Sequence, residues 1–230
     1  MEGCEHIPGR CACEHHETCE CDQCEAEAAA AALPAAAVAS PAAALPDPAA
    51  LPLARKWVVW ISRPPAKGSL RTNEICGSFA TVADMWGALN FVRVDAISLG
   101  ADLCYFAEGV KPTWEDNAKG GRWMVGVTIT NTAGVLIPAN VTAARATWET
   151  ICLGLFGGSF DDSGEAVGVV ASRRGSIYRL SVWTRDCHSP TVLPLGERIK
   201  ACFLEQRLGG RLEYAKHGAD YGDTIHTITV

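Results

Sequence analysis

Residues Val167–Thr184 read VGVVASRRGSIYRLSVWT, with β-rich runs on either side of a basic turn. The runs Val167–Ser172 and Ile177–Thr184 predict two strands, and the Arg-Arg-Gly sequence at 173–175 predicts an exposed turn between them. Strands joined by so short a turn pair antiparallel. This segment therefore favours an antiparallel sheet.

The rest of the chain repeats the same arrangement of paired strands between single helices. Further strands are predicted over Lys56–Ser62, Asp102–Ala107, Arg122–Thr130, Arg211–Tyr214 and Thr224–Val230. Helices are predicted from Thr81 and over Ala143–Phe156 and Leu195–Leu208, and loops over Ile61–Ser78 and Gly109–Gly121. The order predicts an α+β fold, in which an antiparallel sheet carries helices on one face and leaves the other face free to bind a ligand.

Composition divides the chain near Leu51. Residues 1–54 hold nine acidic residues and one Arg, a net charge of −8, and the remainder holds 19 basic and 17 acidic residues, a net charge of +2, which together give −6. The slightly basic body weakens the argument that an acidic protein avoids nucleic acid. We predict an acidic Cys/His-rich tail at 1–25, an Ala/Pro-rich linker at 26–50 and a folded domain at 51–230.

The tail holds six Cys and three His within its first 24 residues. Thiolates and imidazoles suit zinc or Cu(I), and the candidate ligands are Cys11, Cys13, Cys19, Cys21 and Cys24. Their spacing does not match the paired C-x2-C knuckles of a zinc finger, and the segment has almost no apolar residue. A disordered acidic tail is therefore preferred, ahead of adventitious metal binding and of a specific metal site.

Several classes of protein are excluded by what the sequence lacks. No stretch offers 18 continuous apolar residues for a membrane span, and the acidic N-terminus does not have the pattern of a secretory signal. The five scattered cysteines of the body then indicate reduced thiols in a cytoplasmic protein. No Walker loop, G-x-S-x-G or H-E-x-x-H motif is present, so we expect neither an enzyme nor a cofactor.

The loop Gly109–Gly121 carries the residues that favour binding. Trp114 offers an indole face for stacking on a flat ring, and Glu115 can accept two parallel N–H bonds from the edge of guanine. An N7-methylated, positively charged ring would add a cation–π term of about 0.5–2 kcal/mol. The alternative is a packed loop Trp beside a solvated carboxylate. Guanidinium groups for phosphates lie on or beside the hairpin turn, at Arg173, Arg174 and Arg179.

Longer motifs occur in a recognisable order. They are Lys56–Trp60, Phe79–Trp86, Gly109–Asp116, Gly120–Trp123, Gly158–Asp162 and Val182–Thr184. On these motifs the chain resembles the mRNA cap-binding translation initiation factor 4E family, most strongly over Leu51–Thr184. The family carries eight spaced tryptophans, and seven match here: Trp57, Trp60, Trp86, Trp114, Trp123, Trp148 and Trp183.

The resemblance implies a curved antiparallel sheet backed by three helices on its convex face, with the cap slot on the concave side. It implies that Trp114 stacks on 7-methylguanine, that Glu115 reads the guanine edge and that Trp183 contacts the N7-methyl group. The positions that match phosphate contacts are Arg173, Arg179 and Arg122, with Arg174 as a neighbouring candidate.

A second site is implied on the convex side, for a scaffold or repressor helix with a Tyr-x4-Leu-hydrophobic motif. Its residues here are Pro52, Val82 and Trp86. Trp86 also has a simpler interpretation, because it lies at core spacing on its helix. The apolar partner expected beside Trp148 is replaced by Glu149, which predicts a different choice of partners.

One departure from the family concerns the second stacking face. The family supplies an aromatic ring from the loop after the first strand, and residues 61–78 contain no aromatic residue. Stacking is worth roughly 1–3 kcal/mol per base, so its loss weakens binding. Two substitutes are open, the guanidinium of Arg71 and a Leu70 lid.

These observations predict a monomeric cytoplasmic protein that binds the 7-methylguanosine cap of mRNA and a scaffold of the initiation factor 4G type or a 4E-binding repressor, to support or regulate translation initiation. The missing aromatic keeps an alternative open, an interaction module or translational repressor of the same fold with weak or no cap binding. A third reading is a metal-binding protein that acts through its Cys-rich tail.

Overall fold

The computed structural model describes residues 47, 51–64, 72–161, 163–218 and 223–230. Contacts divide the chain into Met1–Leu45 and Pro46–Val230, and all described residues belong to the second unit. The predictions for the Cys-rich tail and for most of the linker lie outside the described residues. So do Leu70 and Arg71, the two candidates for the second stacking face.

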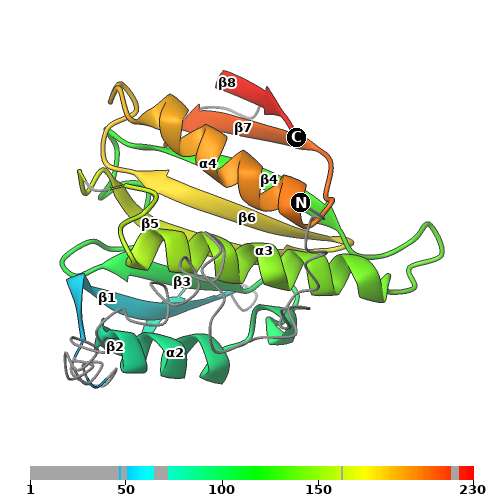
Figure 1. Ribbon diagram of the computed structural model, residues 1–230. Helices are drawn as coiled ribbons and strands as arrows, with labels where there is room; N and C mark the ends of the chain where they lie inside the picture. The colour runs from blue at the N-terminus through cyan, green and yellow to red at the C-terminus, as the bar shows by residue number, and fades with distance from the viewer. Residues whose placement is uncertain (1–46, 48–50, 65–71, 162, 219–222) are drawn as a thin grey trace, which may run out of the picture. The chain divides into compact units, whose positions relative to one another are not determined.

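The described strands form one antiparallel sheet (Figure 1). In chain order they are β1 (Pro52–Arg63), β2 (Thr72–Thr81), β3 (Asp102–Ala107), β4 (Gly121–Thr128), β5 (Ala166–Arg174), β6 (Ile177–Thr184), β7 (Arg211–Lys216) and β8 (Thr224–Thr229). Their spatial order is β2-β1-β3-β5-β6-β4-β7-β8, and every neighbouring pair is antiparallel. The predicted antiparallel sheet is thus confirmed.

Helices α2 (Val82–Phe91), α3 (Pro138–Phe156) and α4 (Val192–Glu205) lie across one face of this sheet in Figure 1. A short 3-10 turn, η2 (Val94–Ala96), follows α2. Helix α3 begins earlier than predicted because proline is tolerated at the first helical position, where its missing N–H would have no partner. Together the sheet and the three helices confirm the α+β fold.

The N-terminus of α2 shows how sequence signals set an element. The side chain of Thr81 accepts a hydrogen bond from the backbone N–H of Asp84 at 3.2 Å, and its hydroxyl donates to the Asp84 carboxylate at 2.8 Å. This satisfies one of the N–H groups that the first helical turn leaves open. The capping pattern predicted at this position is confirmed.

Strand β2 was not predicted, and the expectation of a loop over the whole of Ile61–Ser78 is wrong. β1 continues to Arg63, and β2 pairs with it from the Arg63–Thr72 pair to the Pro52–Thr81 pair. Most β2 side chains are exposed and only Phe79 is buried, so no alternation of apolar and polar residues marks this strand. Backbone pairing with β1 makes this segment a strand, and a local pattern does not reveal it.

The hairpin turn is shorter than the sequence indicated. Arg173 and Arg174 belong to β5, and Arg174 pairs directly with Ile177 at the start of β6. The turn consists of Gly175 and Ser176, and Gly175 has a φ of 55°, which glycine adopts without strain.

Two apolar clusters cover the two faces of the sheet. The larger fills the space beneath the helices and contains the fully buried rings of Trp57 and Trp123, with Trp148 stacked on Tyr105 at 5.6 Å between ring centroids. The smaller lies on the helix-free face and consists of Cys104, Phe106, Val167, Val170 and Trp183. The helix-free face thus has its own apolar floor, on which a binding site can be built.

Two further searches concern only the residues that the structure describes. None of their helices is both long enough and apolar enough to cross a membrane. Among the same residues, no group of three or more His, Cys, Asp and Glu side chains is placed to hold a metal ion.

Candidate functional site

A hollow of about 810 Å³ opens on the helix-free face of the sheet. We call it the basic pocket. Its walls include Trp114 from the loop after β3 and Trp183 from β6, together with three arginines, Arg122, Arg174 and Arg179. Five of the predicted site residues, distant in sequence, are thus gathered around one hollow.

Strand alternation explains why these side chains meet. Leu180 and Val182 of β6 belong to the core under the helices, so Arg179 and Trp183 point to the opposite face. Arg122 of β4 pairs across the ladder with Trp183 and points the same way. The pocket therefore has an aromatic wall directly beside guanidinium groups.

The charge of the pocket suits an anion. Arg122 and Arg179 form no ion pair with any carboxylate of the described residues. Burial lowers the pKa of Arg122, and the neighbouring Arg179 guanidinium lowers it further, because both positive charges are held in one partly buried space. A ligand with several negative charges would relieve this repulsion.

Arg174 is held in place by its neighbours. Its Nη2 lies 2.6 Å from the Asp102 carboxylate, and its Nη1 donates to the backbone carbonyls of Ala101 and Arg173, each at 3.2 Å. A guanidinium fixed in this way is already oriented toward the pocket, so less freedom is lost when it binds an anion.

Arg173, the other arginine predicted at this position, lies on the opposite face. It pairs across the ladder with Tyr178, which belongs to the core under the helices, and it does not line the basic pocket. One residue along a strand changes the face on which a side chain lies. The structure thus brings Arg174 to the pocket and leaves Arg173 outside it.

The loop between β3 and β4 presents Trp114 to solvent. Asn117 braces the loop by donating through Nδ2 to the carbonyls of Lys111 at 2.8 Å and Thr113 at 2.6 Å. Trp114 is 53% exposed, and its ring lies against Gly218, where an added Cβ would stand 3.7 Å from Cε3. The alternative of a packed loop tryptophan does not hold, and the indole face is available for stacking.

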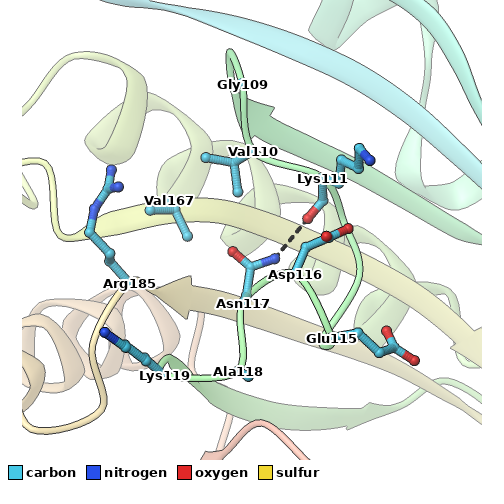
Figure 2. Close-up of a pocket in the computed structure, with 10 residues that line it drawn as sticks. All are labelled: Gly109, Val110, Lys111, Glu115, Asp116, Asn117, Ala118, Lys119, Val167 and Arg185. Carbon is cyan, nitrogen blue, oxygen red and sulfur yellow. Dashed lines mark hydrogen bonds between the residues drawn. The ribbon is translucent and has the colours of Figure 1, made fainter.

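Glu115 lines a different hollow, of about 530 Å³ at the end of the strands (Figure 2). Figure 2 shows its carboxylate turned away from Val110 and Val167, and Asp116 turned toward Lys111. Trp114 does not line this second hollow, and Glu115 does not line the basic pocket. The structure therefore brings five predicted residues together and leaves Glu115 and Arg173 apart from them.

One pocket residue was missed by the sequence analysis. The His217 side chain is only 6% exposed, and its ring centroid lies 4.1 Å from that of Trp183. Burial, followed by the charge of Arg122, lowers the pKa of His217 to about 4, so the imidazole is neutral at pH 7. In the sequence, His217 was marked only by its position just after the strand predicted near Arg211–Tyr214. Its contact with Trp183 arises because the sheet brings the end of β7 near β6.

The residues of the second predicted site, Pro52, Val82 and Trp86, lie on and beside α2. The Val82 N–H donates to the Leu51 carbonyl at 2.9 Å, and Pro52 pairs with Thr81, so the first strand lies beside the start of the helix. Trp86 is 45% exposed, whereas its neighbours in the helical pattern, Met85 and Leu89, are buried. The core interpretation of Trp86 is therefore wrong, and the ring is available for an interface.

Glu149 on α3 is half-buried and lies 2.8 Å from Arg145, one helical turn earlier. It therefore adds a charged pair to α3 directly after the buried Trp148.

The described residues form an eight-stranded sheet with helices on one face and a basic, tryptophan-walled pocket on the other, an arrangement whose chemistry suits an anionic ligand that carries a flat ring. The family described as "Eukaryotic initiation factor 4E" matches residues 52–227, and the chain belongs to this family. The resemblance inferred from the sequence is thereby confirmed.

Individual relatives agree with this assignment. Eukaryotic translation initiation factor 4E-1 of Schizosaccharomyces pombe is 35% identical over 157 residues, which cover 65% of this chain and 67% of that protein. The structure of Ascaris suum eIF4E-3 with an m2,2,7G cap superposes with a TM-score of 0.65 at 26% identity, over 77% of this chain and 98% of that chain. A schistosome eIF4E complexed with m7GpppA and 4E-BP gives a TM-score of 0.62 at 25% identity, over the same shares.

Proposed function

We propose that this chain binds the 7-methylguanosine cap of mRNA in the basic pocket and a scaffold or repressor helix on the outer side of α2, and so supports or regulates translation initiation. The observation that carries the cap-binding part is the gathering of Trp114, Trp183, Arg122, Arg174 and Arg179 around one hollow. The solved relatives with cap analogues support the same conclusion.

The chemistry of the pocket matches the parts of a cap. Trp114 stacks on the methylated base, whose positive charge adds a cation–π attraction of about 0.5–2 kcal/mol. Trp183 forms the apolar wall for the methyl group. Arg122, Arg174 and Arg179 bind the phosphate chain through charge-assisted hydrogen bonds, which are roughly twice as strong as neutral ones.

We propose two further roles around the stacked base. For Glu115 to read the guanine edge, its carboxylate must turn from the second hollow toward the base that Trp114 stacks on. The opposite face of that base would be covered by Arg71 or Leu70. Arg173 is proposed only as a more distant positive charge, because its strand position directs it away from the pocket.

We propose that the chain acts as a monomeric binding protein of the cytoplasm, without a catalytic role or a cofactor. Its role is to bring capped mRNA and a partner protein together. The residues of the basic pocket hold the ligand. A less favoured alternative is a metal-binding protein that acts through the acidic tail, with Cys11, Cys13, Cys19, Cys21 and Cys24 as candidate ligands.

The alternative function is a same-fold interaction module or translational repressor with weak or no cap binding. It is favoured by the absence of an aromatic residue between positions 61 and 78. Such a protein would keep the interface at Trp86 and lose selectivity for the methylated cap.

Tryptophan fluorescence of the full chain during titration with m7GTP and with GTP separates the two functions. We expect quenching at micromolar or lower m7GTP and a much weaker response to GTP. Trp114→Ala should abolish the quenching, whereas Trp86→Ala, which also removes one exposed tryptophan, should retain it. Equal responses to the two nucleotides, or none, would support the interaction module.

A further inference from the structure

The imidazole of His217 is a buried polar group whose hydrogen bonding is incomplete. Its Nε2 is shielded from solvent and has no hydrogen-bond partner among the described residues. Buried polar groups in native proteins are nearly always paired, and an unpaired one destabilises the fold. The position of this nitrogen therefore requires an explanation.

The surroundings of His217 belong to the basic pocket, which the residue itself lines. The ring of Trp183 on β6 packs against the imidazole at a tilt of 41°, and Arg122 of β4 is close enough to lower its pKa. The backbone N–H of His217 donates to the Gly120 carbonyl at 3.0 Å, which fixes the residue at the end of the β4–β7 ladder. The side chain is thus held firmly while its nitrogen remains without a partner.

A neutral imidazole carries one N–H donor and one acceptor, whichever tautomer is present. The charged groups that share the pocket with His217 are mostly donors: Arg122, Arg174, Arg179, Arg211 and Lys216, with Asp102, Glu213 and Asp223 as acids. A ligand drawn to these guanidinium groups brings anionic oxygens. Such an oxygen is an acceptor, and an N–H at Nε2 would complement it.

We propose that His217 is a further recognition residue of the basic pocket, whose Nε2–H donates a hydrogen bond to a phosphate oxygen of the bound nucleotide. The inference rests on the proposed cap-binding function and deepens it. It places a neutral donor beside the arginines, at the end of the pocket where Trp183 and Trp114 stand.

Two side chains of the basic pocket lie around this segment. The indole of Trp114 lies against Gly218, the residue that follows His217, and Trp183 packs against the imidazole itself. The imidazole therefore lies at the aromatic part of the pocket wall. Because Nε2 is shielded from solvent, a phosphate oxygen must displace part of this wall to reach it.

Two substitutions of the full chain test the proposal. His217→Phe keeps an aromatic ring on Trp183 and removes the donor, whereas His217→Gln places an amide N–H near the position of Nε2. Binding is measured with m7GTP and with the nucleoside 7-methylguanosine, which has no phosphate. We expect Phe to weaken m7GTP binding about tenfold with little effect on the nucleoside, and Gln to restore most of the loss.

A role in packing alone predicts a different pattern. His217→Phe would then leave the m7GTP affinity unchanged, or both ligands would weaken together, and either result overturns the proposal. Thermal unfolding adds a second readout, because Phe removes an unpaired polar atom and should leave the melting temperature equal or higher. If the unsubstituted chain binds neither ligand, the proposed function itself has failed, which is a distinguishable outcome.

Discussion

At the scale of single residues, the buried imidazole of His217 links the free energy of unfolding to pH. Its folded pKa of about 4 lies below the ordinary value of 6.5, so the unfolded chain binds more protons between these two values. The contribution to stability is therefore complete above about pH 6.5 and is lost as the pH falls toward 4. We expect roughly 3 kcal/mol of pH-dependent destabilisation from this group.

Urea unfolding at pH 7 and pH 4 measures this effect, with His217→Phe as the test variant. The variant should lose less stability between the two pH values than the unsubstituted chain. The same pH dependence in the Phe variant would show that other groups are responsible.

The neighbouring arginines of β5 provide a second residue-scale prediction. Arg174 lines the basic pocket, and Arg173 pairs opposite a core residue on the other face. Arg174→Ala should weaken m7GTP binding about tenfold, and Arg173→Ala less than about twofold, because an anion meets only one of the two guanidinium groups. Calorimetric titration of both variants checks this. A larger effect at Arg173 would contradict the strand register described above.

At the scale of elements, helix α4 depends on a close approach to the sheet. A Cβ at Gly196 would stand 2.4 Å from Cζ2 of Trp123, whose Nε1 donates to the Val192 carbonyl at 2.8 Å. Gly196→Ala should therefore destabilise the fold by about 1–3 kcal/mol through overpacking.

Gly87 in α2 is the matched control for this substitution. A Cβ there would meet no atom within 4 Å. Gly87→Ala should therefore stabilise the fold by about 0.5–1 kcal/mol, because alanine favours the helix more than glycine does. Chemical denaturation of both variants measures the difference. If both substitutions changed the free energy of unfolding equally, α4 would have to shift away from Trp123 without any loss of stability.

Helix α2 also carries the proposed partner interface. Trp86→Ala should weaken binding of a peptide with a Tyr-x4-Leu-hydrophobic motif at least about tenfold, since an exposed tryptophan is a common interface anchor. Fluorescence anisotropy of a labelled peptide measures the affinity. Leu193→Ala on α4 removes a comparably exposed apolar side chain and should have no effect. A peptide that tolerates Trp86→Ala must bind elsewhere.

At the scale of the whole molecule, the N-terminal part of the chain and the remainder carry opposite net charges. Residues 1–54 carry a net charge of −8, and the rest carries +2. A chain of residues 51–230 should bind m7GTP as the full chain does, within about twofold at physiological salt, because it holds every residue that lines the basic pocket and salt weakens repulsion between the acidic tail and the phosphates. Parallel titrations test this. A large loss on truncation would assign the tail a part in binding.

Most elements of the fold were predictable because local patterns specify them. Strands β3 and β6 have the predicted bounds, and the Thr81–Asp84 cap sets the start of α2 as expected. Strand β2 was not predictable in this way, because few of its side chains are buried and its pairing partner, β1, specifies it.

The candidate site was predictable in its residue types more than in its arrangement. Trp114, Trp183 and Arg122 were identified as binding residues, and the structure places all three around the basic pocket. Glu115 was paired with Trp114 because they are neighbours in sequence, yet they line different hollows. Adjacent loop residues point in different directions, so adjacency alone does not place two side chains on one ligand.

The sequence by itself determined the strands and helices other than β2, the cap of α2, the family and the kinds of residue available for binding. Only the tertiary structure decided which side chains meet: Arg174 rather than Arg173 in the pocket, Trp86 outside the core, and His217 against Trp183. The physical reason is that local patterns depend on residues a few positions apart. The face on which a strand residue lies depends on its pairing with distant strands, where a shift of one residue reverses the direction of every side chain.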